Sequence, residues 1–123
     1  MVLIIGGAFQ GKTKYVKEKY GVKDAEIYDA VIPNNPDGRI VINHLHEYIR
    51  RSMKNGENPE EEIEKITEHE NVVILCDEIG NGVVPFDPFE REFRERTGRI
   101  LIRIAAKAET VERVVCGIAM RIK

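Results

Sequence analysis

Eight residues near the start of the chain match the phosphate-binding pattern G-x-x-x-x-G-K-[ST]. Glycines let backbone N–H groups approach an anion without obstruction by Cβ atoms, and a helix that starts at the loop adds its dipole. We expect the loop to hold the β- and γ-phosphates of GTP or ATP, with Lys12 stabilising charge on the transferred group. The loop residues are Gly6, Gly7, Ala8, Phe9, Gln10, Gly11, Lys12 and Thr13.

A second candidate position is the acidic end of the apolar run Val72 to Cys76. A nucleoside triphosphate normally carries Mg²⁺, so we expect the Thr13 hydroxyl and the Asp77 carboxylate to hold that metal. The next residue, Glu78, is a candidate catalytic group that would orient a nucleophile or hydrogen-bond the glycine-bearing loop after it. The alternative is that these acids are solvated ends of a strand.

Short apolar runs alternate with amphipathic segments and must position these groups. The pattern predicts an α/β fold, namely a three-layer P-loop NTPase-like domain with a mostly parallel sheet, formed by residues 1–123 as one nucleotide-binding domain. Expected strands are Val2 to Ile5, a segment within Ala25 to Ile32, Ile40 to Ile42, Val72 to Cys76, and one or two terminal strands formed by Val111 to Cys116 and Ala119 to Ile122. Expected helices are Gly11 to Tyr20, His44 to Lys54, Pro59 to His69, and a long one after Pro85 that Gly98 bends or divides.

In the long helix, Phe86, Phe89 and Phe93 recur at helical spacing, and we expect them in the core. Four of its arginines follow an acidic residue by four positions, which predicts local ion pairs rather than a phosphate-binding patch. Those arginines are Arg91, Arg94, Arg96 and Arg99.

Composition limits the classes of partner and compartment. The 123 residues carry 19 Lys plus Arg against 21 Asp plus Glu, so the formal charge of −2 argues against nucleic acid as a partner. Apolar stretches of four or five residues predict no membrane span, and the absence of a basic leader favours the cytoplasm. Cys76 and Cys116 are expected to be buried, reduced thiols.

Four segments together resemble the adenosylcobinamide kinase/adenosylcobinamide-phosphate guanylyltransferase family of cobalamin biosynthesis. They are Gly6 to Ala8, Asp77 to Pro85, Arg94 to Arg99 and Val115 to Lys123. The resemblance implies a Mg²⁺-dependent kinase and nucleotidyltransferase that uses GTP or ATP. It implies a cobinamide-type corrinoid as acceptor, a nucleotide carried on a histidine, and a homo-oligomer.

The chain also departs from that family. Members are longer, and the missing stretch, before Ile40, normally carries the histidine that accepts GMP. If Ile40 to Tyr48 corresponds to the family's third strand and following helix, neither His44 nor His46 occupies that place, whereas an alternative register puts them nearer to it. His46 is the better candidate, and helical spacing predicts that at most one of the two faces the nucleotide. The family tends to have an acid where this chain has Asn43, so either Asn43 or Asp77 supports the metal. The alternative function is a nucleotide-binding regulatory or assembly module that has lost catalysis.

Overall fold

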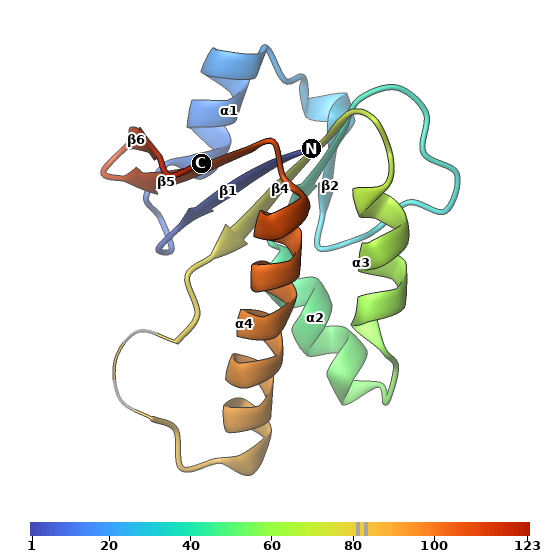
Figure 1. The fold of residues 1–123 in the computed structure, drawn as a ribbon, viewed down its shortest axis with the longest axis vertical. Coiled ribbons are helices and arrows are strands. Elements are labelled where there is room, and N and C mark those ends of the chain that lie inside the picture. Colours follow the sequence, from blue (N-terminus) through green and yellow to red (C-terminus); the bar gives the residue numbers. More distant parts are fainter. Residues whose placement is uncertain (81, 83) are drawn as a thin grey trace.

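The computed structural model describes residues 1–80, 82 and 84–123; Asn81 and Val83, which fall in the predicted glycine-bearing segment after Glu78, lie outside the described residues. Within these ranges six strands form one sheet in the order β2-β3-β4-β1-β5-β6 (Figure 1). All neighbouring strands pair in parallel except β5 and β6. The strands are β1 (Val2–Gly6), β2 (Ile27–Asp29), β3 (Ile40–Asn43), β4 (Val72–Asp77), β5 (Thr110–Val115) and β6 (Ile118–Arg121). The helices are α1 (Lys12–Tyr20), α2 (Leu45–Lys54), α3 (Pro59–Thr67), α4 (Pro88–Lys107) and the short η1 (Asp24–Glu26).

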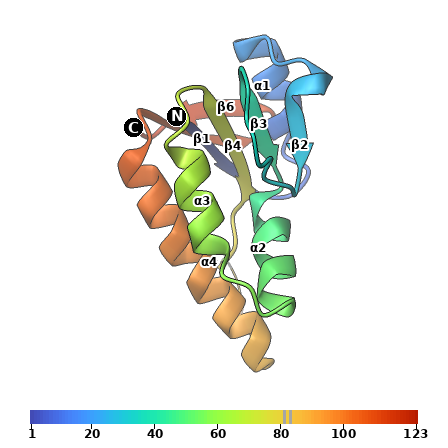
Figure 2. The same cartoon turned by 90° about the vertical axis from the view of Figure 1, so that its right-hand side faces the viewer.

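Helices cover both faces of the sheet and give the expected three layers. Helix α1 lies on one face, and α2, α3 and α4 lie on the other (Figures 1 and 2). Successive residues of a strand point to opposite faces, so Leu3 joins the core beneath α2, α3 and α4, whereas Ile4 joins the core beneath α1. Because both faces of these strands are buried, nearly every residue in them is apolar.

The helices that follow the neighbouring strands β1 and β4 lie on opposite faces of the sheet. The chain leaves β1 through α1 on one face, and it leaves the adjacent β4 through α4 on the other (Figure 1). In open α/β sheets, ligands bind outside the carboxyl ends of the strands at such a switch point. The β1–β4 register pairs Gly6 with Asp77 there, so the fold brings the start of the phosphate loop to the predicted acidic position.

The expected elements are confirmed, with differences in the long helix. Helix α4 starts at Pro88 after the N-cap Asp87 and continues through Gly98 without a break. Phe93 is buried and Phe89 is half-buried, but Phe86 precedes the helix and is 92% exposed, so its predicted place in the core is wrong.

The predicted pairing of the arginines with acids one turn earlier is confirmed for Arg96, but the arginines also reach other elements. Arg96 lies 4.0 Å from Glu92 one turn earlier and 2.5 Å from Glu60 of α3. Arg91 donates to the Pro85 carbonyl, and Arg94 donates to the carbonyls of Gly80 and Gly82. Long arginine side chains reach neighbouring elements, where they tie the β4–α4 connection and α3 to α4.

The two cysteines differ in their surroundings. Cys76 is buried in β4, as expected, whereas Cys116 is exposed in the turn between β5 and β6, which corrects its predicted burial. No helix in the described ranges combines the length and apolarity that crossing a membrane requires.

Candidate nucleotide site

The phosphate loop runs directly from β1 into α1. Its backbone turns through left-handed conformations at Phe9 (φ 58°) and Gly11 (φ 87°), and glycine adopts such a conformation without a Cβ penalty. Gly11 is the N-cap of α1, and no side chain caps the first turn. The first amides of a helix have no intrahelical acceptor, so this end of α1 offers donors and a positive dipole to an anion.

The loop is held against the sheet and against the β5–β6 turn. A Cβ added at Gly6 would lie 2.5 Å from the Val114 carbonyl oxygen, so only glycine fits this approach. The Gln10 carbonyl accepts from the Gly117 amide at 2.8 Å, and its side-chain Oε1 accepts from the Cys116 amide at 2.7 Å. The C-terminal hairpin therefore supports the outer side of the loop.

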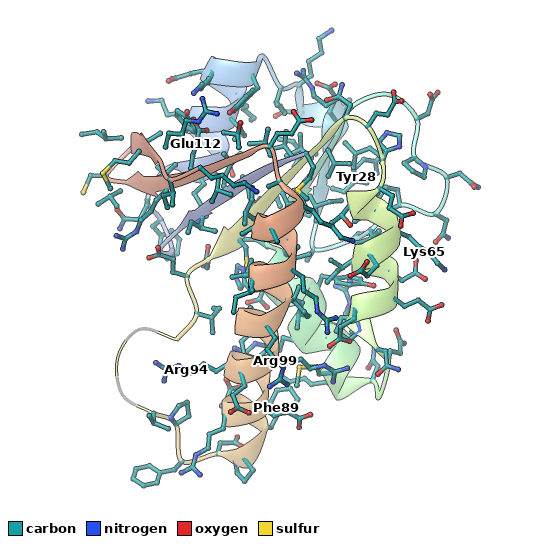
Figure 3. All side chains as sticks on the ribbon, in the orientation of Figure 1. Tyr28, Lys65, Phe89, Arg94, Arg99 and Glu112 are labelled. Atoms are coloured by element: carbon teal, nitrogen blue, oxygen red, sulfur yellow. The ribbon has the colours of Figure 1, made fainter. Side chains whose placement is uncertain are left out.

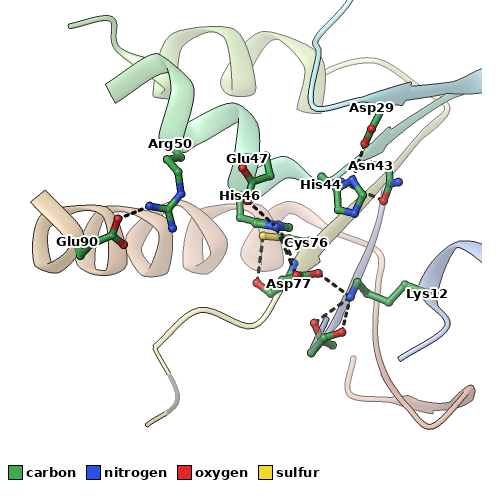
Figure 4. Close-up of polar contacts among 12 residues, drawn as sticks. Lys12, Asp29, Asn43, His44, His46, Glu47, Arg50, Cys76, Asp77 and Glu90 are labelled. Carbon is green, nitrogen blue, oxygen red and sulfur yellow. Dashed lines mark hydrogen bonds and ion pairs between the residues drawn. The ribbon is translucent and has the colours of Figure 1, made fainter. Parts of the chain in front are cut away.

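Lys12 and Asp77 form an ion pair at the switch point. The Lys12 Nζ lies 2.8 Å from the Asp77 carboxylate and donates to the carbonyls of Gly6 (3.1 Å) and Gly7 (2.7 Å) (Figure 4). Both side chains are mostly shielded from solvent, at 8% and 17% exposed. Lys12, the predicted phosphate ligand, and Asp77, the predicted metal ligand, therefore lie in direct contact.

A cavity of about 390 Å³ opens over this pair. It brings together the predicted residues Lys12, Thr13 and Asp77 with Asn43 and both histidines. Its lining is Ala8, Phe9, Gln10, Gly11, Lys12, Thr13, Lys14, Asn43, His44, His46, Glu47 and Asp77. It has the size of a small-ligand site, and it is lined by cationic and polar groups suited to an anionic ligand.

Glu78 is not brought into this cavity. Its carboxylate forms an ion pair with Arg113 at 2.7 Å, and it lines a separate cavity with Arg50 and Phe93. Neighbouring residues at a strand end point in opposite directions, which separates Glu78 from Asp77. A catalytic role for Glu78 stays a prediction.

The oxygen donors in the cavity fit Mg²⁺. Thr13, Asn43 and Asp77 present a hydroxyl, an amide and a carboxylate, and Mg²⁺ prefers such hard ligands. The residues described contain no group of three His, Cys, Asp or Glu that could hold a metal by themselves. The site therefore suits a cation that takes one or two protein ligands and completes its shell with substrate phosphates and water.

His46 is buried beside Asp77. Its Nδ1 accepts from the Asp77 amide at 3.2 Å, and its Nε2 lies 3.4 Å from both the Asp77 and the Glu47 carboxylates. Burial lowers the pKa of His46, although both carboxylates act in the opposite direction. The ring is consequently neutral at pH 7 and packs as part of the support of Asp77.

His44 also lines the cavity, which overturns the expectation that at most one of the two histidines faces it. His44 precedes α2 as its N-cap, with φ 53°, so helical spacing does not apply to the pair. Its Nδ1 lies 2.5 Å from the Asp29 carboxylate, and the two histidine rings stand 5.6 Å apart, nearly perpendicular (Figure 4). Sequence reasoning missed Asp29, because its partner becomes visible only in the β2–β3 register that pairs Asp29 with Asn43.

Two curated proteins are similar to part of this chain. The bifunctional adenosylcobalamin biosynthesis protein CobU of Salmonella typhimurium (strain LT2) is 44% identical over 52 residues, and the CobU of Escherichia coli (strain K12) is 42% identical over 52 residues. Each match covers 42% of this chain and 29% of the relative, so the aligned stretch is less than a third of those proteins.

A family model covers more of the chain. The model described as "Cobinamide kinase / cobinamide phosphate guanyltransferase" matches residues 28–122. The match includes Asp77, both cavity histidines and the β5–β6 hairpin, and it begins after the phosphate loop, which is assigned from its pattern and geometry. The chain belongs to the cobinamide kinase / cobinamide phosphate guanyltransferase family.

Proposed function

We propose that the chain is a Mg²⁺-dependent phosphotransferase that uses GTP or ATP and acts on a cobinamide-type corrinoid. The observation that carries the proposal is the meeting of Lys12 and Asp77 at 2.8 Å, between the phosphate loop and the end of β4. Membership of the family supplies the acceptor class.

The chain's own residues bind and orient the triphosphate. The loop amides and the N-terminus of α1 would hold the β- and γ-phosphates, and the Lys12 ammonium would move from Asp77 to the terminal phosphate. This exchange releases the Asp77 carboxylate. Thr13 and either Asn43 or Asp77 would then hold Mg²⁺, which neutralises charge on the phosphates.

The test is nucleotide binding by Lys12→Ala, measured by calorimetry with GTP, ATP and Mg²⁺. A hydrogen bond to a charged group contributes about 1.5–3 kcal/mol, so the dissociation constant should rise roughly 10- to 100-fold. Lys17→Ala is the matched control, because Lys17 lies on the same helix but pairs with Asp24 on the surface. Equal affinity of Lys12→Ala and wild type would reject the assignment.

Turnover separates this enzyme from the alternative, a regulatory or assembly module that binds nucleotide without catalysis. With a cobinamide acceptor, the enzyme should consume triphosphate faster and form a phosphorylated product. Binding without acceptor-dependent product would favour the module.

Several broader properties belong to the same proposal. We propose that residues 1–123 act as one nucleotide-binding domain, that the protein works in the cytoplasm as a homo-oligomer, and that it does not bind nucleic acid. The near-balanced charge of 19 basic and 21 acidic residues supports the last point.

A further inference from the structure

The phosphate loop carries an aromatic ring that the fold does not use. Phe9 is fully exposed, with a relative exposure of 103%, so the described chain buries essentially none of its ring. Moving an aromatic side chain from water onto an apolar surface is favourable, and this chain leaves that gain unrealised at Phe9. Single exposed apolar residues are common on proteins, so the position of this one decides whether it has a role.

Phe9 lies at the candidate nucleotide cavity, and its backbone is unusual for its residue type. Apart from Phe9 and Ala8, the residues that line the cavity are glycine, polar or charged, so Phe9 supplies nearly all of its hydrocarbon surface. The φ of Phe9 is 58°, in the left-handed region that bulky residues adopt only at a steric cost. Residues in this conformation cluster at active sites and ligand-binding segments.

The neighbours of Phe9 in the loop are held in place. Gln10 accepts hydrogen bonds from the amides of Gly117 (2.8 Å) and Cys116 (2.7 Å) in the β5–β6 turn. Two residues before Phe9, the Gly7 carbonyl accepts from the ammonium of the loop lysine at 2.7 Å. A ring with two side-chain torsions on such a backbone loses little conformational freedom when a ligand packs against it.

The place of Phe9 in the loop indicates which reactant it meets. The lysine of this binding pattern reaches the β- and γ-phosphates, and Phe9 lies three residues before Lys12, between β1 and α1. The base of the nucleotide is attached beyond the α-phosphate, at the far end of the triphosphate. The acceptor, in contrast, must approach the γ-phosphate in line with the bond that breaks. A ring near the γ-phosphate therefore faces the acceptor rather than the base.

We propose that Phe9 determines specificity for the acceptor, by packing its ring against an apolar face of the acceptor and so holding the acceptor's hydroxyl group at the γ-phosphate. This inference rests on the proposed function, because it requires a triphosphate in the cavity and a cobinamide-type corrinoid as the acceptor. A corrin is a conjugated macrocycle that carries methyl groups, so it presents hydrocarbon that the polar remainder of the cavity does not match.

The experiment compares Phe9→Asn with the wild-type chain in Mg²⁺ and a saturating concentration of GTP or ATP. Initial rates of cobinamide phosphorylation are measured against the concentration of cobinamide. The half-saturating cobinamide concentration should rise about tenfold or more, because the burial of the ring against the acceptor is lost. The rate at saturating cobinamide should change far less. The dissociation constant of the triphosphate, measured by calorimetry, should stay at its wild-type value.

Two matched variants accompany this comparison. Phe86→Asn replaces another exposed phenylalanine, which is 92% exposed and does not line the cavity, and it should keep the wild-type half-saturating cobinamide concentration. Phe9→Tyr keeps an aromatic ring and should stay close to wild type.

Thermal unfolding tests for a merely structural role of the ring. Phe9 contributes no packing, and asparagine tolerates the left-handed backbone, so Phe9→Asn should melt at the wild-type temperature or above it. A structural role would instead lower the melting temperature and the triphosphate affinity together.

The outcomes separate this inference from the proposed function. An unchanged half-saturating cobinamide concentration in Phe9→Asn, or an equal rise in Phe86→Asn, would overturn the role of Phe9 alone. A loss confined to triphosphate affinity would also overturn it, because the ring would then contact the nucleotide. A wild-type chain that binds neither GTP nor ATP, or that forms no cobinamide-dependent product, would remove the proposed function itself.

Discussion

A backbone carbonyl of β5 leaves no room for a Cβ atom at Gly6. The Val114 carbonyl would lie 2.5 Å from an added Cβ, and a main-chain atom of the central sheet has little freedom to move away. The need for glycine at this position therefore comes from close packing between β1 and β5.

Gly6→Ala should lower the free energy of unfolding by about 1–3 kcal/mol, the usual effect of overpacking. Gly98→Ala is the contrasting variant: apart from its chain neighbours and the backbone of its own helix, no atom of the described chain lies within 4 Å of a Cβ built there, and alanine favours a helix by about 1 kcal/mol over glycine. Urea unfolding of both variants measures the difference. Equal stabilities would mean that the β1–β5 approach is looser than described.

Single residues with a local signature were predictable, and residues whose role depends on a distant partner were not. Lys12 and Thr13 follow from the loop pattern, and Asp77 from the end of an apolar strand. The Lys12–Asp77 ion pair requires the β1–β4 register, and the Asp29–His44 contact requires the β2–β3 register. Strand order is a long-range property that local periodicity does not contain.

At the scale of elements, a buried carboxylate fastens α1 to β5. Glu112, which Figure 3 labels, is 2% exposed. Its carboxylate accepts hydrogen bonds from Tyr15 (2.8 Å), Lys19 (2.6 Å) and Tyr20 (2.9 Å). Burial alone would raise the pKa of Glu112, but the three hydrogen bonds and the Lys19 charge outweigh it and lower that pKa. The same network raises the pKa of Tyr20 to about 12, first through burial and then through its bond to Glu112. Helix α1, which follows the phosphate loop, is therefore held to β5 by hydrogen bonds and an ion pair to Glu112 as well as by apolar packing.

Glu112→Gln should destabilise the protein by about 1–3 kcal/mol at pH 7, because one charged acceptor of three donors is lost. A carboxyl with a depressed folded-state pKa stabilises the fold fully above its unfolded pKa, near 4.5, and loses that contribution as the pH falls through the lower folded value. The difference between wild type and Glu112→Gln should therefore shrink below about pH 4.5. Urea unfolding from pH 7 to pH 3 measures it, with exposed Glu109→Gln as control. A difference that stays constant with pH would contradict the ionised network.

Element boundaries were easier to predict than their side-chain contacts. Asn58 followed by Pro59 predicts a helix start, and α3 begins at Pro59. Gly21 predicts a helix end, and α1 ends at Tyr20. The arginines of α4 were predicted to pair with acids on their own helix; Arg96 does pair with Glu92, but it lies closer to Glu60 of α3. A helix that packs beside another offers its long side chains more partners than one turn of sequence shows.

For the whole molecule, β6 leaves an apolar stripe at one edge of the sheet. Ile118 and Met120 are 69% and 52% exposed, and Ile122 beyond the strand is 59% exposed. An edge strand with exposed apolar side chains is suited to pairing with another chain. The stripe is the surface where we expect the proposed homo-oligomer to form.

Met120→Lys should shift the protein toward monomer in sedimentation velocity, because a lysine on an edge strand disfavours pairing. Val31→Lys is the control: it replaces an exposed apolar residue just after β2, the opposite edge strand. A wild-type protein that sediments as a monomer, or a Met120→Lys variant that assembles like wild type, would exclude this surface.

The contact between Gln10 and the β5–β6 turn has a consequence for how the chain is made. The two partners are 106 positions apart, so a ribosome finishes one long before it begins the other. The candidate phosphate loop can gain this contact only after the hairpin has been synthesised and has paired with the central strand β1. Nascent chains that stop before Cys116 should consequently fail to capture nucleotide, even though every residue of the binding pattern has already been translated.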